Sequence, residues 1–247
     1  MSMKGLLPTL QTLLNTELIL PPVFENLPLI GAFSKKLPYS FNFELLNSLN
    51  SFRFFFPKQL HSTKIIELKE TVSYDLFLCF FKIEGDAVFT TQKHIFIGVR
   101  TADCVPVLIT NKSADFVGVV HGGWRGSVNK LLFKFLQKII GFGYKPEDIL
   151  IAIGPHVKAC CYEVGEDVIE VLRKNFKEAE NFLIFKNKKI FLDLEKLNYY
   201  QALKCSIPPD NIWVSKDCTC CLNNYYWSHR FHKEKRGFQI SFIGKLR

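Results

Sequence analysis

Three residues that commonly bind metal ions, His61, Cys104 and His121, lie in separate segments of the chain. Intervals of 43 and 17 residues separate them; these are unlike the closely spaced cysteine pairs of structural zinc, and they predict a site assembled from three segments. A thiolate and two imidazoles fill three positions of a tetrahedral zinc ion, and water in the fourth would be a nucleophile near neutral pH. Copper accepts the same ligand types, so zinc and copper both stay open. With 8 cysteines and 6 histidines in the chain, the alternative is a buried thiol and two ordinary histidines.

Three polar residues near these ligands are candidates for catalysis. Asp103 precedes Cys104 and is interpreted as a general base or as a group that orients a ligand, with capping of the following turn as an equal alternative. Arg125 follows His121 in a glycine-rich turn, where its planar fork suits phosphate or ribose oxygens or a structural ion pair. Glu163 would carry a proton or bind a sugar hydroxyl, or would shape the approach to a helix.

Five further cysteines form two groups, Cys160-Cys161 and Cys218-Thr219-Cys220-Cys221. Adjacent cysteines are poor disulfide partners, because a disulfide requires a particular separation of the Cα atoms. A second metal site made from both groups is one hypothesis, but their spacing does not show that the two segments meet. We therefore predict reduced, buried thiols in both groups.

The elements that would position these residues begin with a series of short β-like runs. Such runs lie at 29–33, 52–56, 64–68, 76–83, 87–91, 95–99, 105–110 and 116–121. Cys104 lies just before one predicted strand, and His121 ends another. The ligands are thus expected at strand ends and turns, where loops present side chains to a cleft.

The period of the apolar residues changes after residue 127. A helical stripe runs through 131, 132, 135, 136, 139 and 140, and Gly141 and Gly143 end that helix. Later runs predict strands at 149–153, 212–214 and 238–243, helices at 166–176 and 194–204, and a hairpin that pairs 182–185 with 189–192. No repeat, linker or charge block divides the chain, so we predict one domain, 1–247, with an α/β fold in which helices flank a mixed sheet.

Composition is typical of a folded protein. Of 247 residues, 48% are hydrophobic and 22% are charged, which excludes a disordered chain. The longest apolar run, 76–81, is far shorter than the ~18–20 residues that a membrane span requires. Polar residues and a proline interrupt the apolar N-terminal segment, and no cleavage site follows it. We expect a cytoplasmic protein with no membrane partner.

The net charge of +9 favours anionic partners. The basic residues are mostly dispersed, however, and no nucleic-acid-binding motif accompanies them. One dense group near the C-terminus is interpreted as a solvated, helix-free rim; it consists of Arg230, Lys233, Lys235, Arg236, Lys245 and Arg247. We expect no specific nucleic-acid partner.

Several motifs occur together in an order that resembles one known family. They are Gln59-Leu60-His61, Gly85-Asp86-Ala87, TADCVPVL (101–108), HGGWRG (121–126), Ile153-Gly154-Pro155 and CYEVG (161–165). Over about residues 28–244 they resemble the YfiH-like, laccase-domain or polyphenol-oxidase-like family. This resemblance implies a single-domain α/β sandwich of mixed strands, which structural classification groups with cysteine hydrolases.

The resemblance also implies a metal site and several activities. The family's ligands, one cysteine and two histidines, map onto His61, Cys104 and His121. Members have been described as copper-dependent laccases, and zinc-bearing members as purine nucleoside phosphorylases with adenosine deaminase and methylthioadenosine phosphorylase activities. Members commonly carry an Arg-Arg pair and a Gly-Arg pair near the last strand, of which Arg230 alone stands in place here. Arg125 and Arg230 are therefore the candidates for binding phosphate.

The function favoured by these observations is that of a zinc-dependent purine nucleoside phosphorylase, with a purine nucleoside and phosphate as its small-molecule partners. Copper-dependent oxidation of phenols is the second hypothesis, although one Cys-His-His site does not supply the several coppers that laccases use. A third makes Cys104 a nucleophile and His121 its base, for hydrolysis or editing of peptidoglycan precursors. A basic binding module is the non-enzymatic alternative.

Overall fold

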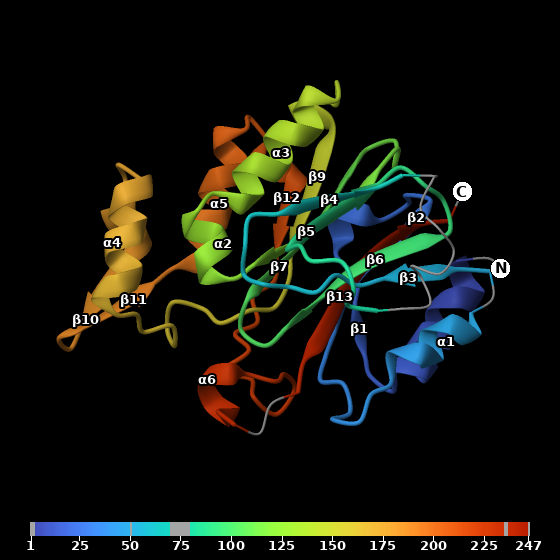
Figure 1. The fold of residues 1–247 in the computed structure, drawn as a ribbon, viewed down its shortest axis with the longest axis horizontal. Coiled ribbons are helices and arrows are strands. Elements are labelled where there is room, and N and C mark those ends of the chain that lie inside the picture. Colours follow the sequence, from blue (N-terminus) through green and yellow to red (C-terminus); the bar gives the residue numbers. More distant parts are fainter. Residues whose placement is uncertain (1–2, 50, 70–79, 235–236, 247) are drawn as a thin grey trace.

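The computed structural model describes residues 3–49, 51–69, 80–234 and 237–246. Two mixed β-sheets pack against each other, and helices cover their outer faces (Figure 1). The five-stranded sheet has the order β1-β2-β13-β6-β3. Its strands are β1 (Leu18–Ile19), β2 (Leu29–Ser34), β13 (Gln239–Lys245), β6 (Ile95–Thr101) and β3 (Arg53–Phe55).

The second sheet places Cys104 just before one strand and His121 near the end of another. Its order is β12-β9-β7-β8-β5-β4. The strands are β12 (Ile212–Val214), β9 (Ile149–Ile153), β7 (Val105–Asn111), β8 (Val117–Gly122), β5 (Ala87–Thr90) and β4 (Ile65–Leu68). Strand β7 is antiparallel to both of its neighbours, whereas β9 and β12 run parallel. The loops that follow β9 and β12 therefore leave the sheet at the same edge.

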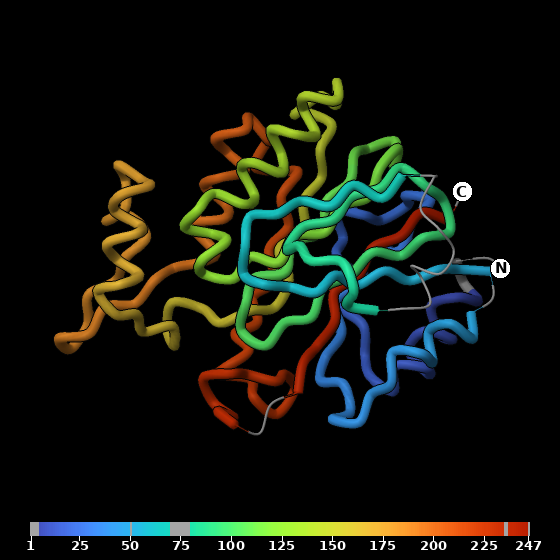
Figure 2. Tube along the Cα trace, viewed as in Figure 1, coloured from blue at the N-terminus to red at the C-terminus, as the bar shows by residue number. Residues whose placement is uncertain are grey.

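The helices of the described residues are α1 (Met3–Leu14), α2 (Trp124–Val128), α3 (Leu131–Gly141), α4 (Glu166–Asn175), α5 (Leu194–Lys204) and α6 (His229–His232). Helices α1, α3 and α5 cover outer faces of the sheets, and α4 and α6 lie at their edges (Figure 1). Helix α1 packs on the five-stranded sheet, while α3 and α5 cover the six-stranded one. Helix α4 and the hairpin of β10 (Leu183–Lys186) and β11 (Lys189–Leu192) lie at the opposite end of the molecule from α1 (Figure 2).

The alternation of side chains along β7 explains how this layered core forms. Val105, Val107 and Ile109 belong to the cluster beneath the helices, whereas Leu108 points into the cluster between the two sheets. Successive side chains of a strand face opposite sides of its sheet. Because both sides of β7 are covered, the whole strand is buried, and its residues are apolar except for Thr110 and Asn111 at its end.

The predicted α/β class and most of the predicted elements are confirmed. The helix at 194–204, the strands at 149–153, 189–192 and 212–214, and the turn at 187–188 match the structure, and the other confirmed elements differ by one or two residues at their ends. The mixed strands form two large sheets with a core between them. Helical periodicity and β-alternation were sufficient for elements such as α3 and β9 because each of them buries a continuous apolar face.

Some sequence-based predictions are wrong. Of the strand predicted at 76–83, residues 80–83 contain no strand, with a turn at 80–81, and the rest lies outside the described residues. The C-terminal rim is not free of helix, because Ser228 caps the short helix α6 by accepting a hydrogen bond from the Phe231 amide. Lys245 is not solvated either: it is 7% exposed, and its Nζ donates to the carbonyl oxygens of Thr91 (2.9 Å) and Asp115 (2.7 Å). Lys235, Arg236 and Arg247 lie outside the described residues.

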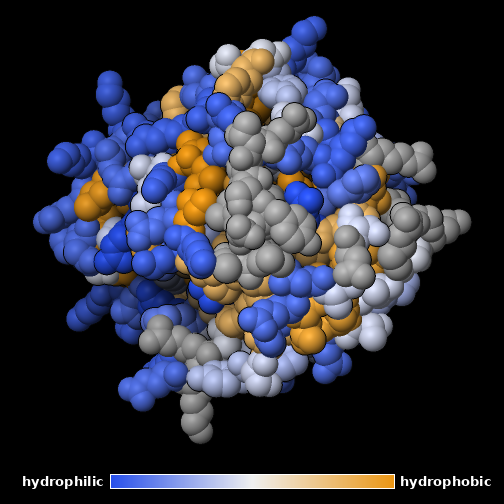
Figure 3. All heavy atoms as spheres, turned by 45° about the vertical axis from the view of Figure 1, so that its right-hand side comes forward, coloured by the Kyte–Doolittle hydropathy of each residue, from blue (hydrophilic) through white to orange (hydrophobic). Residues whose placement is uncertain are grey.

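The surface of the described residues is mostly polar on the face that Figure 3 shows. Smaller hydrophobic areas lie between the polar side chains. Among the described residues, no helix combines the length and the apolar character that crossing a membrane requires.

Candidate metal centre and active site

The fold brings His61, Cys104 and His121 together. The nitrogen and sulfur atoms that these residues offer to a metal lie within 4.8 Å of one another. Strands β7 and β8 are antiparallel, and Val105 pairs with Gly122, so the residue before β7 and the end of β8 are neighbours. His61 reaches the same point from the loop between β3 and β4. Sequence spacing alone could not show this contact, because it depends on the pairing of β7 with β8.

The three donor atoms fit a small, tetrahedral metal ion. Cys104 Sγ lies 3.8 Å from His61 Nε2, close to the roughly 3.6 Å expected between a thiolate and an imidazole on one tetrahedral zinc. The rings of His61 and His121 meet edge to face, with centroids 4.8 Å apart. His121 is buried, Cys104 is partly buried and His61 is exposed. A metal held here would therefore keep one open side toward solvent.

Gly123 leaves the space that this arrangement needs. A Cβ atom at position 123 would lie 2.7 Å from His61 Cδ2, 3.3 Å from Cys104 Sγ and 3.5 Å from the His121 ring. The first distance is shorter than a normal contact, so any side chain here would displace His61. The glycine at this position in HGGWRG is thus explained by close packing against all three donors.

The carboxylate of Asp86 holds two of the three candidate ligands, His61 and His121, in place through hydrogen bonds. This buried carboxylate accepts a hydrogen bond from His121 Nδ1 (2.8 Å) and from the backbone amides of Leu60 (3.2 Å), His61 (2.9 Å) and Ser62 (2.7 Å), and the Ser62 hydroxyl donates to it at 2.7 Å. These bonds hold His61 in a left-handed backbone conformation, φ 58°. They also leave His121 Nε2 directed toward the metal position, a common role for carboxylates behind metal-binding histidines.

The charges of this group favour a thiolate. Burial alone would raise the pKa of the Cys104 thiol, but the adjacent His121 and His61 lower it to about 6. Burial alone would lower the pKa of His121, but Cys104 and Asp86 raise it to about 9. For Asp86, hydrogen bonds from His121 and Ser62 outweigh burial and lower the pKa to about 2. A thiolate beside two imidazoles is the donor set that borderline metal ions such as zinc prefer, and a metal that binds here would displace the proton from His121.

The three candidate ligands open onto a cavity of about 940 Å³. Aromatic and basic side chains share its wall with the three ligands; among them are Arg100, Trp124, Arg125, Tyr162, Arg230 and Phe238. Such a mixture of flat apolar surface and a few charged groups is typical of small-molecule sites.

Three arginines line this cavity, Arg100, Arg125 and Arg230, and no ion pair with a carboxylate is found for any of them among the described residues. The Arg125 guanidinium lies over the Trp124 ring, 4.3 Å from its centroid, and the Arg230 guanidinium lies 4.8 Å from the centroid of Tyr162. Arg230 also donates to the backbone carbonyl of Glu163. Arg125 and Arg230 therefore retain charge that an anionic ligand could neutralise.

Asp103 lies in the cavity wall, and its carboxylate is already engaged. It accepts hydrogen bonds from Thr219 Oγ1 (2.6 Å), Ser228 Oγ (3.0 Å) and the Arg230 amide (2.8 Å). Its backbone is in the left-handed region, φ 90°, which is strained for a residue with a side chain. These contacts tie the start of α6, and with it Arg230, to the residue that precedes Cys104.

Glu163 is not among the residues that line the cavity. Its carboxylate pairs with Lys189 Nζ at 2.9 Å, on the side of the β10–β11 hairpin. The neighbouring Tyr162 lines the cavity instead. The structure thus unites the three predicted ligands with Asp103, Arg125 and Arg230, and it adds Asp86 and Gly123, for which the sequence analysis proposed no role. Both belong to motifs that carry the family resemblance, which is the signal that could have found them.

Comparison with known proteins identifies the family. The family model described as multi-copper polyphenol oxidoreductase laccase matches residues 41–245, so the chain belongs to this family. A purine nucleoside phosphorylase from Aquifex aeolicus is 37% identical over 169 residues, which cover 68% of this chain and 72% of that protein. An adenosine deaminase, RL5, from an unknown prokaryotic organism is 31% identical over 179 residues, covering 70% of this chain and 68% of that one.

A solved structure shares the whole fold. YlmD from Geobacillus stearothermophilus superposes with a TM-score of 0.79 at 24% identity, covering 92% of this chain and 94% of that chain. YfiH from Bacillus licheniformis gives a TM-score of 0.80 at 23% identity, covering 93% of this chain and 97% of that chain. The family resemblance predicted from the motifs is therefore confirmed.

Proposed function

We propose that this member of the laccase-domain family is a zinc-dependent purine nucleoside phosphorylase that converts a purine nucleoside and phosphate into a free base and a sugar phosphate. The names of the relatives support the reaction class. The observation that carries the proposal is a three-ligand metal group in the same cavity as three arginines that have no acidic partner in the described chain.

A catalytic zinc is favoured over a multicopper centre because the described residues offer one Cys-His-His group rather than several histidine-rich ones. His61, Cys104 and His121 supply three donors, the usual set for a catalytic zinc with one open position. When bound, such an ion would polarise a water molecule or a substrate oxygen. A multicopper oxidase needs further copper sites rich in histidine, whereas the second candidate metal group of the described residues consists of cysteines alone.

The remaining residues would bind and orient the substrate. The planar forks of Arg125 and Arg230 suit the oxygens of phosphate, and stacking on Trp124 and Tyr162 keeps each fork in place. Aromatic rings in the wall offer surfaces on which a purine base can stack.

The proton-transfer roles predicted for Asp103 and Glu163 stay predictions. The hydrogen bonds of Asp103 suit a residue that positions Arg230, and the ion pair of Glu163 directs its carboxylate toward Lys189. Both substitutions, Asp103→Asn and Glu163→Gln, belong in the activity assay below. A bell-shaped pH profile that loses one limb in either variant would identify the proton carrier.

The test is the release of purine bases, measured by chromatography. Zinc-loaded protein is incubated with inosine or adenosine, with and without phosphate. We expect phosphate-dependent release of hypoxanthine or adenine from the wild type, and none from His121→Ala, which lacks a ligand. His94→Ala is the matched control, because His94 is an exposed histidine that contacts the Leu246 carbonyl, outside the cavity. Failure of the wild type to release base, or equal release by His121→Ala, would refute the proposal.

The same assay separates the alternative activities. Conversion of adenosine into inosine without phosphate would indicate the deaminase activity for which one relative is named. Methylthioadenosine, offered as a further substrate with phosphate, tests the third activity that the family resemblance implies. Cleavage of an amide or of a peptidoglycan precursor that depends on Cys104 but needs no metal would favour the cysteine hydrolase hypothesis.

A further inference from the structure

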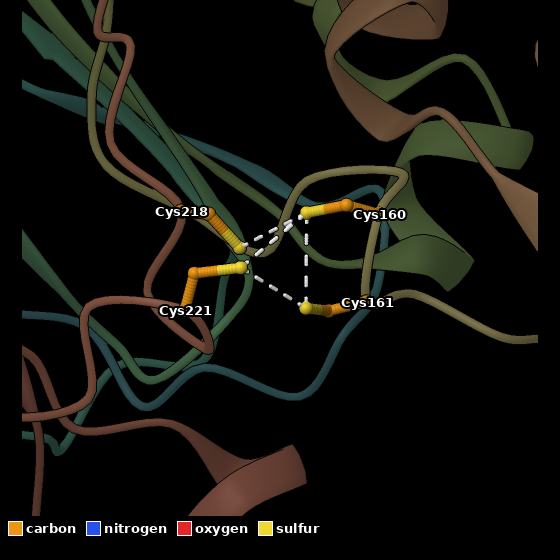
Figure 4. A group of neighbouring side chains, drawn as sticks. All are labelled: Cys160, Cys161, Cys218 and Cys221. Carbon is orange, nitrogen blue, oxygen red and sulfur yellow. Dashed lines mark hydrogen bonds between the residues drawn. The ribbon is translucent and has the colours of Figure 1, made fainter.

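Four cysteine side chains converge at a second place in the fold. The Sγ atoms of Cys160, Cys161, Cys218 and Cys221 lie within 4.8 Å of one another and point toward a common centre (Figure 4). Cys160 Sγ lies 3.7 Å from Cys161 Sγ, 3.7 Å from Cys218 Sγ and 3.6 Å from Cys221 Sγ. Cys161 and Cys221 are 3.4 Å apart. The thiols are reduced, as predicted, and Cys218 is buried; the prediction of burial is wrong for Cys160 and Cys221, which are exposed, and Cys161 is half-buried.

These distances are those of four sulfur ligands on one ion. Around a tetrahedral zinc with Zn–S bonds of about 2.3 Å, the sulfur atoms lie about 3.8 Å apart. All four residues are free cysteines, so no disulfide accounts for the approach. The space between the sulfur atoms accommodates a single ion rather than a multi-iron cluster.

The topology of the sheet explains why these residues meet. Cys160 and Cys161 follow β9, whereas Cys218 and Cys221 follow β12. Because β9 and β12 are parallel neighbours, their loops leave the same edge of the sheet. The loops stay paired beyond the strands, since the Thr219 amide donates to the His156 carbonyl at 3.0 Å.

The backbone also supports a thiolate in the cluster. The Lys158 amide donates to Cys218 Sγ at 3.4 Å. Cys218 and Cys221 are separated by two residues, the short spacing common in structural zinc sites.

We propose that Cys160, Cys161, Cys218 and Cys221 bind a structural zinc ion that links the loop after β9 to the loop after β12. Four protein ligands leave no open position, in contrast to the three-ligand group in the cavity. The two loops contain little helix or strand. The bound ion would hold them together, a role that buried apolar side chains have elsewhere in the fold.

The location of this site gives it a role in shaping the active site. Tyr162, next to Cys161, lines the cavity, and Thr219, between Cys218 and Cys220, donates to Asp103. The zinc would thus fix the part of the cavity wall that carries Tyr162, and through Asp103 the segment that carries Arg230.

The test combines metal analysis with X-ray absorption at the zinc edge, on the full-length protein freed of excess zinc. It uses the His121→Ala background, which removes the three-ligand site and so separates this proposal from the proposed activity. We expect about one zinc per chain there, surrounded by four sulfur atoms at about 2.3 Å. Adding Cys218→Ser should abolish this zinc, whereas adding Cys220→Ser should retain it, because Cys220 is not in the four-cysteine group.

A second variant guards against misfolding. Cys218 is buried, so Cys221→Ser, at an exposed position, should lose the zinc while its circular dichroism still shows a folded protein. Zinc bound through nitrogen or oxygen, iron in place of zinc, or full zinc retention in folded Cys221→Ser would overturn the proposal.

Discussion

The substitution Asp86→Asn tests whether the buried carboxylate holds the metal ligands in place. Asn has the same shape but replaces one acceptor oxygen with an NH₂ group. Asp86 Oδ1 accepts from His61 N and His121 Nδ1, while Oδ2 accepts from Leu60 N and from both the amide and the hydroxyl of Ser62. In either orientation, the new NH₂ group therefore faces at least two donors.

The expected loss follows from these contacts. A buried donor left without an acceptor costs about 1–3 kcal/mol, so two give a destabilisation of about 2–6 kcal/mol. Loss of the carboxylate behind a metal-binding histidine should also weaken zinc binding by about 10–100-fold. Urea unfolding in the presence of a chelator measures the first effect without metal, and competition with a chromophoric chelator measures the second.

The control for this experiment is Asp148→Asn. The Asp148 carboxylate is 44% exposed and reaches Lys112 Nζ only at 3.6 Å, so its loss should change the unfolding free energy by less than about 0.5 kcal/mol. If Asp86→Asn behaved like this control in both measurements, the role assigned to Asp86 would be wrong.

Three further substitutions test the site and the core. Gly123→Ala should weaken zinc binding about tenfold or more in the chelator competition, because the new Cβ displaces His61. The backbone at residue 123 (φ −63°) tolerates alanine, so the free energy of unfolding without metal should change little. Arg125→Lys should raise the KM for phosphate and leave zinc content unchanged, since an ammonium group cannot reproduce a bidentate fork; an unchanged KM contradicts this. Lys245→Met should lower the unfolding free energy by about 1–3 kcal/mol, because two carbonyl acceptors lose their donor. Exposed Lys186→Met is its control in urea unfolding, and equal stability of the two variants would argue against the role of Lys245.

Residue types and order were sufficient to predict that His61, Cys104 and His121 come together, but not the residue that supports them. Cys104 and His121 lie at the ends of strands with clear apolar patterns, and His61 belongs to a motif that resembles the family. Asp86 has the same family signal, yet its role depends on three consecutive backbone amides, 60–62, that a turn directs at one carboxylate. Every residue except proline has a backbone N–H whatever its side chain, so the sequence alone could not show which amides contact Asp86.

The four-cysteine group shows a different limit of sequence analysis. The strands β9 and β12 were each predicted correctly, but their pairing joins segments about 60 residues apart. An intervening helix, hairpin and second helix separate them along the chain. Two parallel strands can pair only when a long crossover joins them. Because the crossover is long, the sequence does not show that the loops at its two ends lie close together.

Hydrogen bonds connect the two groups of candidate metal ligands. Asp103 precedes Cys104 in the first group, and it accepts a hydrogen bond from Thr219, which follows Cys218 in the second. Its other oxygen holds the Arg230 amide. A change in the four-cysteine group would therefore reach the cavity through Asp103, by moving Arg230 and the backbone beside Cys104. The left-handed backbone of Asp103 fits this role, because a strained conformation persists only where surrounding contacts enforce it.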